Sequence, residues 1–209
     1  HGIKNVRVLD RTFNYNNKRA KELLNLFLEF SPDICFHLEI HPALLSEELK
    51  KELAGLPKGL LHLEAGIQSL REPVLEQSRR MGRLSDALDG LKYLCSLHNM
   101  ETHADLIAGL PLYHLSEIFE DIHTLAEYGA GEIQLESLKL LPGTEMRRRA
   151  EELGIQYAPL PPYEVLQTRE ISVDELQTAR VLSRLLDGFY NTPTWQNITR
   201  TLMLENEHF

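Results

Sequence analysis

Apolar and polar residues follow two alternating periods along most of the chain. Segments rich in β-branched and apolar residues are each followed by a longer segment in which leucine and alanine recur at helical spacing. Strands are predicted at 3–9, 34–40, 60–67, 102–108 and 132–140, and helices at 18–30, 46–56, 72–79, 85–97, 115–128 and 145–153. This order is typical of successive βα units around a parallel sheet.

The number of βα units indicates the fold class. A closed barrel of eight strands needs about 250 residues, and this chain has 209. The sequence therefore predicts an α/β fold, a partial, open TIM-type βα barrel of about five parallel strands. After Gly154 prolines interrupt the pattern, and a helix is predicted at 173–189. We expect a partial barrel at 1–154 and a C-terminal extension with a helical subdomain at 155–209.

Polar residues occupy alternate positions on the predicted strands. Residues two apart on a strand share a face, so acidic, amide and imidazole groups collect on one face of the sheet. That face carries His37, Glu39 and His41, then His62, Glu64 and Gln68, then His103 and Asp105, and finally Gln134 and Glu136. Barrel interiors are normally filled with Val, Ile and Leu, and buried polar groups are costly without a partner. The pattern predicts a polar, ligand-holding barrel mouth.

Residue spacing alone leaves several functions open for this polar face. In a metal-dependent hydrolase, His37 and His41 together with His103 and Asp105 could supply ligands to Zn²⁺ and leave one position for water. That hypothesis gives no role to Gln68. A non-catalytic binding module of the same fold is a third interpretation.

Composition narrows the classes of partner and site. The 22 basic and 31 acidic residues give a net charge of −9, which opposes nucleic-acid binding. No apolar run is long enough to span a bilayer, so we expect a cytoplasmic protein without membrane contact. The two cysteines, Cys35 and Cys95, lie in apolar settings and are expected to be buried thiols. Two isolated thiols cannot build a four-thiolate iron–sulfur site.

Three motifs occur in an order that resembles the radical S-adenosylmethionine superfamily of iron–sulfur oxidoreductases. Glu64–Ser69 followed by Arg80 resembles the superfamily's G-[IV]-Q-S turn and the arginine twelve residues after its glutamine. Asp105–Pro111 resembles its D-L-I-x-G-L-P strand end, and Glu39 lies in a segment that resembles E-x-x-P. The resemblance implies that this chain is the C-terminal part of such a barrel.

Further segments resemble the branch of the superfamily that has an N-terminal cobalamin-binding domain. They are Val8–Asn14, Glu136–Thr144, Pro161–Leu166 and Leu186–Asn191. The family's first strand and its cluster-binding C-x-x-x-C-x-x-C loop have no counterpart in this sequence and would precede His1. We therefore expect a piece of a longer protein that is inactive by itself.

The resemblance implies a role for four residues in binding S-adenosylmethionine. Glu39 would hold the methionyl part, Gln68 and Asp105 would hydrogen-bond the ribose, and Arg80 would pair with the methionyl carboxylate. Other polar residues are expected on the substrate side or as structural groups, with no metal ligand in this chain: Asp10, His37, His62, Glu64, His103, Gln134 and Glu136.

The resemblance also implies a chemistry and partners. A [4Fe–4S] cluster held outside this chain would cleave S-adenosylmethionine reductively, and a 5′-deoxyadenosyl radical would abstract hydrogen from a substrate. An electron donor such as flavodoxin or ferredoxin, and cobalamin in an upstream domain, belong to this expectation. The substrate, a small molecule or another class, is not indicated. Because an open sheet edge invites pairing, we also expect a homodimer.

Overall fold

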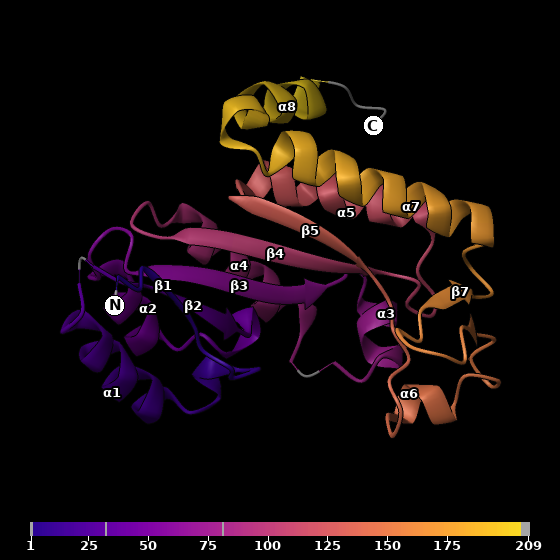
Figure 1. The fold of residues 1–209 in the computed structure, drawn as a ribbon, viewed down its shortest axis with the longest axis horizontal. Helices are drawn as coiled ribbons and strands as arrows, with labels where there is room; N and C mark the ends of the chain where they lie inside the picture. Colours follow the sequence, from indigo (N-terminus) through magenta and orange to yellow (C-terminus); the bar gives the residue numbers. More distant parts are fainter. Residues whose placement is uncertain (1, 32, 81, 206–209) are drawn as a thin grey trace. The chain divides into compact units, whose positions relative to one another are not determined.

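The computed structural model describes residues 2–31, 33–80 and 82–205 (Figure 1). Within these residues, five strands form the main sheet in the order β1-β2-β3-β4-β5. Their bounds are β1 Asn5–Arg7, β2 Cys35–Ile40, β3 Leu61–Gln68, β4 Glu101–Ala108 and β5 Glu132–Ser137. The strands are parallel and form an open half-barrel flanked by helices. The expected α/β class with a partial TIM-type barrel is therefore confirmed.

The helices alternate with the strands as the periodicity predicts. They are α1 Asn17–Leu28, α2 Glu47–Ala54, α3 Glu72–Gln77, α4 Leu84–Ser96, α5 Leu115–Tyr128, α6 Glu145–Arg148, α7 Val173–Leu185 and α8 Pro193–Glu205, with short helical turns η1 Phe13–Tyr15, η2 Pro42–Leu44 and η3 Leu186–Tyr190. The helix predicted at 145–153 is wrong in length, because α6 stops at Arg148 and turns follow it. The α8 helix was not predicted.

The chain divides into two compact units. Unit 1 comprises His1–Ile67, Gly82–Ala104 and Tyr128–Glu132, and unit 2 comprises Gln68–Met81, Asp105–Glu127 and Ile133–Phe209. The predicted extension from residue 155 onward falls within unit 2, apart from residues 206–209, which lie outside the described part. The domain boundary expected at residue 154 stays a prediction.

The core of unit 1 lies between the apolar face of its strands and its helices. Phe36 of β2 is buried and stacks on Phe27 of α1, with ring centroids 4.0 Å apart. Helix α4 approaches η2 so closely that a Cβ built on Gly90 would lie 2.1 Å from the carbonyl oxygen of Pro42. Ser46 caps α2 by accepting a hydrogen bond from the N–H of Leu49, as expected of a serine at this position.

The core of unit 2 includes the apolar face of α5, where Ile118, Ile122 and Leu125 are buried. Helix α7 runs alongside α5 (Figure 1), and residues of both helices line an apolar cavity of about 250 Å³. Ser172 and Glu175 form a complete capping box at the start of α7. Strands β6 (Gln156–Tyr157) and β7 (Val165–Gln167) make a separate antiparallel pair. Among the described residues, no helix is long and apolar enough to cross a membrane.

Candidate functional site

The strand faces follow the expected alternation of polar and apolar residues. On β2 and β3 the polar positions are half-buried and the intervening apolar positions are buried. The parallel register pairs His37 with His62 and Glu39 with Glu64. Equivalent residues of the two strands therefore stand side by side on one face.

Glu39 and Glu64 share a basic neighbour on β1. Arg7 Nη2 lies 2.6 Å from a Glu64 carboxylate oxygen and 3.8 Å from one of Glu39. Glu64 also contacts His37 Nε2 at 2.8 Å. Glu64 therefore has two close partners. The Glu39 carboxylate is half-exposed, and Arg7 lies farther from it. This is the setting, within unit 1, of the residue expected to hold the methionyl group.

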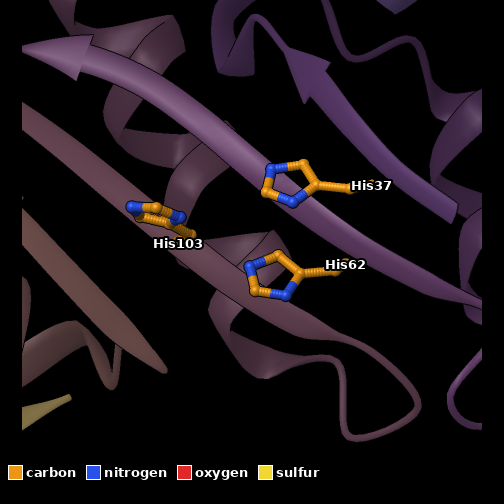
Figure 2. A group of neighbouring side chains, drawn as sticks. All are labelled: His37, His62 and His103. Atoms are coloured by element: carbon orange, nitrogen blue, oxygen red, sulfur yellow. The ribbon is translucent and has the colours of Figure 1, made fainter. Parts of the chain in front are cut away.

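Three imidazoles gather near the starts of their strands in unit 1 (Figure 2). His37, His62 and His103 each offer one nitrogen, and these nitrogens all lie within 4.8 Å of one another. The rings of His37 and His62 stack almost parallel, with centroids 4.5 Å apart, and the His103 ring stands edge-on to His62 at 5.8 Å. The hydrolase hypothesis placed His37 and His103 together from the sequence, but with His41 and Asp105 and not with His62.

Burial and the neighbouring imidazoles favour the neutral form of the central histidine. Desolvation, followed by the charges of His37 and His103, lowers the pKa of His62 below its usual value of 6.5, although Glu132 and Glu101 act in the opposite direction. The His62 ring therefore keeps a lone pair at neutral pH.

His41 does not join this group. Its backbone N–H and carbonyl oxygen are both bound by the side chain of buried Asn14, at 2.9 Å each, and its ring Nδ1 accepts from the N–H of Ala43 at 3.3 Å. Among the described residues, neither group of close potential metal ligands contains His41 or Asp105. The ligand set proposed for a hydrolase, with His37 and His41 together, is therefore not assembled.

In unit 2, Gln68 ends β3 in a left-handed conformation with φ of 71°. Such a backbone costs a non-glycine residue about 1–2 kcal/mol, so the surrounding contacts must hold it. The next residues supply them, because the N–H of Leu70 donates to Asp121 at 2.7 Å and the N–H of Arg71 donates to Ser69 Oγ at 3.1 Å. These hydrogen bonds therefore hold the turn that presents the Gln68 side chain.

Asp121 of α5 is the anchor of this turn, and sequence reasoning missed it. Its buried carboxylate accepts hydrogen bonds from the Tyr113 hydroxyl at 2.6 Å, from the N–H of Leu70 and from Arg71 Nε at 2.8 Å. Burial raises the pKa of Asp121, while Tyr113, Leu70 and Arg71 act to lower it. The available signal was an acidic residue on the apolar face of a predicted amphipathic helix, beside Ile122.

Arg80 is positioned by the way α3 ends. Arg79 takes a left-handed conformation with φ of 52°. The N–H of Arg79 then donates to the carbonyl of Glu76, and the N–H of Arg80 donates to that of Leu75, both at 2.9 Å. These two bonds define a Schellman motif, which usually has glycine where Arg79 stands. The motif places Arg80 immediately beyond the helix.

The guanidinium of Arg80 lies in a partly desolvated setting beside Asp105. Burial lowers the pKa of Arg80 from its usual value, and the charge of Asp105 on β4 opposes that shift. Both side chains are half-buried. After β4, Gly109 turns the chain with φ of 91° and packs against Val165, where a Cβ would lie 3.4 Å from a methyl carbon. Gln68, Arg80 and Asp105 therefore belong to the same unit.

The remaining predicted residues have separate settings. Asp10 pairs with Arg19 at 2.5 Å. Gln134 is half-buried on β5, whereas Glu136 is exposed, contacts Lys139 at 3.6 Å and lines a polar cavity of about 250 Å³ in unit 2.

Cys35 and Cys95 are free thiols and are half-buried, not fully buried as expected. Burial raises the pKa of Cys35.

Solved structures with a similar arrangement include enzymes that use S-adenosylmethionine. One is TsrM from Kitasatospora setae, a radical S-adenosylmethionine methyltransferase with cobalamin and a [4Fe-4S] cluster bound, at 18% identity and a TM-score of 0.59 over 76% of this chain and 34% of that one. Coproporphyrinogen III oxidase (HemN) from Escherichia coli, a radical SAM enzyme, has 18% identity and a TM-score of 0.57 over 82% and 37%. Elp3 from Methanocaldococcus infernus has 15% identity and a TM-score of 0.52 over 72% and 40%.

These likenesses concern the fold. The chain spans only 34%, 40% and 37% of the TsrM, Elp3 and HemN chains. At this level of identity the shared feature is the barrel architecture, which confirms the expected resemblance to the radical S-adenosylmethionine fold. Residues 151–208 match a family described as a protein of unknown function, DUF4080. No curated protein matches the sequence.

Proposed function

We propose that this chain is the later part of a radical S-adenosylmethionine barrel and binds the cofactor with Gln68, Arg80 and Asp105. The observation that carries the proposal is the partly desolvated Arg80 guanidinium beside the Asp105 carboxylate, in a fold similar to that of radical SAM enzymes. The full protein would be an oxidoreductase or transferase. S-adenosylmethionine, reduced by a [4Fe–4S] cluster, supplies the radical chemistry that removes hydrogen from a substrate.

The chemistry of the three side chains fits this cofactor. A guanidinium binds a carboxylate through two parallel hydrogen bonds, and partial desolvation of Arg80 favours an anionic partner. The Gln68 amide and the Asp105 carboxylate offer acceptors for the two ribose hydroxyls. The hydrogen-bonded turn that follows Gln68 keeps its side-chain amide oriented in the absence of ligand. Glu39 is assigned to the methionyl group by the resemblance of its motif.

The cluster and other partners would come from outside this chain. A four-thiolate cluster needs more cysteines than Cys35 and Cys95 provide, so the 209-residue chain is expected to bind the cofactor without cleaving it. We also propose a cytoplasmic protein with a flavodoxin-like or ferredoxin-like electron donor. Cobalamin use is suggested by the TsrM likeness. Pairing of two chains at the open sheet edge is a further part of the proposal.

Calorimetric titration of the 209-residue chain with S-adenosylmethionine tests the assignment. Arg80→Gln should weaken binding about 10- to 100-fold, because a charge-assisted hydrogen bond contributes about 1.5–3 kcal/mol. Arg83→Gln is the matched control, because Arg83 is exposed and pairs with the nearby Asp86. Equal affinity of the Arg80 and Arg83 variants, or no binding by the unaltered chain, would refute the proposal.

A further inference from the structure

The imidazole cluster of unit 1 has no role in the proposed cofactor site. His37 is the third residue of β2, His62 the second of β3 and His103 the third of β4, so all three stand near the starts of their strands (Figure 2). Gln68, by contrast, is the last residue of β3. In parallel barrels the chemistry is built at the carboxyl ends of the strands, so the opposite ends normally serve stability. Three converging histidines there require a separate explanation.

The spacing of the nitrogens is suited to a metal ion. A tetrahedral zinc site with Zn–N distances of about 2.0–2.1 Å places its nitrogens about 3.3 Å apart. The three imidazole nitrogens lie within 4.8 Å of one another, so each pair needs to close by at most about 1.5 Å. Rotation of the rings about χ2, a broad torsion for histidine, would open the His37–His62 stack toward a shared point.

Each imidazole also has a carboxylate on one of its nitrogens. Glu64 lies 2.8 Å from Nε2 of His37, and Glu101 lies 3.6 Å from Nδ1 of His62. Glu132 lies 3.9 Å from Nδ1 of His103. A carboxylate that accepts from the outer nitrogen of a ligating histidine fixes its tautomer and directs the other nitrogen at the metal; Glu64 is within hydrogen-bond distance of His37, whereas the contacts at 3.6 and 3.9 Å are electrostatic only. A ligand set that uses the nitrogen away from each carboxylate would consist of Nδ1 of His37 and Nε2 of His62 and His103.

The surroundings of His62 Nε2 independently favour the same orientation of the His62 ring. This nitrogen is buried and has no hydrogen-bond partner within the part of the chain that the structure describes. A buried polar atom without a partner costs about 1–3 kcal/mol, and a metal bond would remove that cost. The acidic neighbours Glu101 and Glu132, which lie close to His62, would balance the charge of a divalent ion.

We propose that His37, His62 and His103 form a binding site for a divalent transition-metal ion such as Zn²⁺, with water or a neighbouring glutamate as the fourth ligand. Imidazole and carboxylate ligands suit Zn²⁺, Co²⁺ and Ni²⁺. The ion would join β2, β3 and β4 near their starts, and it would stabilise unit 1 by binding only the folded chain. No residue of the site takes part in the proposed binding of S-adenosylmethionine.

Titration of the metal-free 209-residue chain with Zn²⁺, followed by calorimetry, tests the proposal. The expected result is one ion per chain, a rise in the melting temperature, and the visible absorption of tetrahedral Co²⁺ when cobalt replaces zinc. His62→Asn should weaken Zn²⁺ binding at least about 100-fold. Loss of a residue that only hydrogen-bonds a ligand already weakens metal binding by up to about 100-fold, and His62 would be a ligand itself. His98→Asn is the matched control, because His98 is exposed and outside both close ligand groups among the described residues.

Circular dichroism establishes that each variant is folded. If His62→Asn does not fold, His37→Asn at a more exposed position replaces it. The proposal is overturned if the unaltered chain takes up no stoichiometric Zn²⁺, or if the ligand variant binds as tightly as His98→Asn. The outcome is distinct from that of the cofactor test, because Arg80→Gln should leave Zn²⁺ affinity unchanged.

Discussion

Replacing Asp121 with alanine tests how unit 2 holds the turn that presents Gln68. The substitution removes a carboxylate that accepts from the Tyr113 hydroxyl at 2.6 Å, from the Leu70 N–H at 2.7 Å and from Arg71 Nε at 2.8 Å. The Ser69 hydroxyl is a further hydrogen-bond partner of the Tyr113 side chain, but Asp121 is the acceptor that both the Tyr113 hydroxyl and the Leu70 N–H share. Both donors would therefore be left without this acceptor.

The expected loss of stability follows from the burial of these donors. Tyr113 is 0% exposed, and an unsatisfied buried donor costs about 1–3 kcal/mol. The Leu70 N–H is part-buried and adds a smaller cost. The Arg71 side chain is 29% exposed and retains Glu120 at 2.6 Å, so it adds little. We expect a loss of about 3–5 kcal/mol, the magnitude found when one partner of a buried ion pair is removed. This is a large part of the stability of a typical domain, about 5–15 kcal/mol.

Urea denaturation followed by circular dichroism measures this free energy of unfolding. Glu120→Ala is the matched control, because it removes a carboxylate from the same arginine at a position that is 64% exposed. An exposed ion pair contributes up to about 1 kcal/mol. If Asp121→Ala costs no more than Glu120→Ala, the carboxylate does not hold the turn and the reasoning fails. The cofactor affinity should fall with Asp121→Ala as well, because the Gln68 backbone would lose its support.

Three further predictions concern backbone and charge. Gln68→Gly should have a free energy of unfolding about 1 kcal/mol higher than Gln68→Ala, because glycine adopts the φ of 71° without strain. Equal melting temperatures of the two variants would contradict a strained Gln68. Gly90→Ala should destabilise the fold by about 1–3 kcal/mol in urea, because its Cβ meets a backbone carbonyl, whereas Gly188→Ala, with open space around it, should not. Hydrogen bonding to Arg19 holds the pKa of Asp10 below 3.8, so the pair stabilises the fold above that pH and loses this contribution as the pH falls through the lowered pKa. Asp10→Asn should therefore cost less than about 1 kcal/mol at pH 7 and progressively less below pH 3.8, and a cost independent of pH would exclude the ion pair as its source.

The period of the hydrophobic pattern was sufficient to predict the sheet, because burial imposes it directly. On β2 and β3 every second residue is buried, and α5 occupies the predicted range 115–128. The prediction was poorer where the structure depends on local turns. Helix α6 is only four residues long, and a hydrogen bond from the Ile155 N–H to the carbonyl oxygen of Ala150 follows it. The spacing of the apolar residues at 145–153 does not indicate that hydrogen bond.

The candidate site shows a second limit, which arises from strand pairing. Alternation places His37 and His62 on the polar face, but their stacking depends on the register that aligns one with the other across two strands. A shift of one residue would move the side chains of a strand to the other face. The sequence of one strand does not contain that register. Asp121 was missed for a related reason, since the Leu70 N–H that it binds lies 51 residues away in the sequence.

Two groups of polar residues in the two units differ in their chemistry. Near the starts of β2, β3 and β4, the polar groups are imidazoles backed by carboxylates, which provide lone pairs and suit a cation. In unit 2, the groups include a partly desolvated guanidinium and an amide, which provide N–H donors and suit an anion. The group in unit 1 is therefore suited to a metal ion, and the group in unit 2 to the carboxylate of the proposed cofactor. The choice between a metal-dependent hydrolase and a radical enzyme, posed by the sequence as an alternative, thus becomes a question about two separate groups of residues.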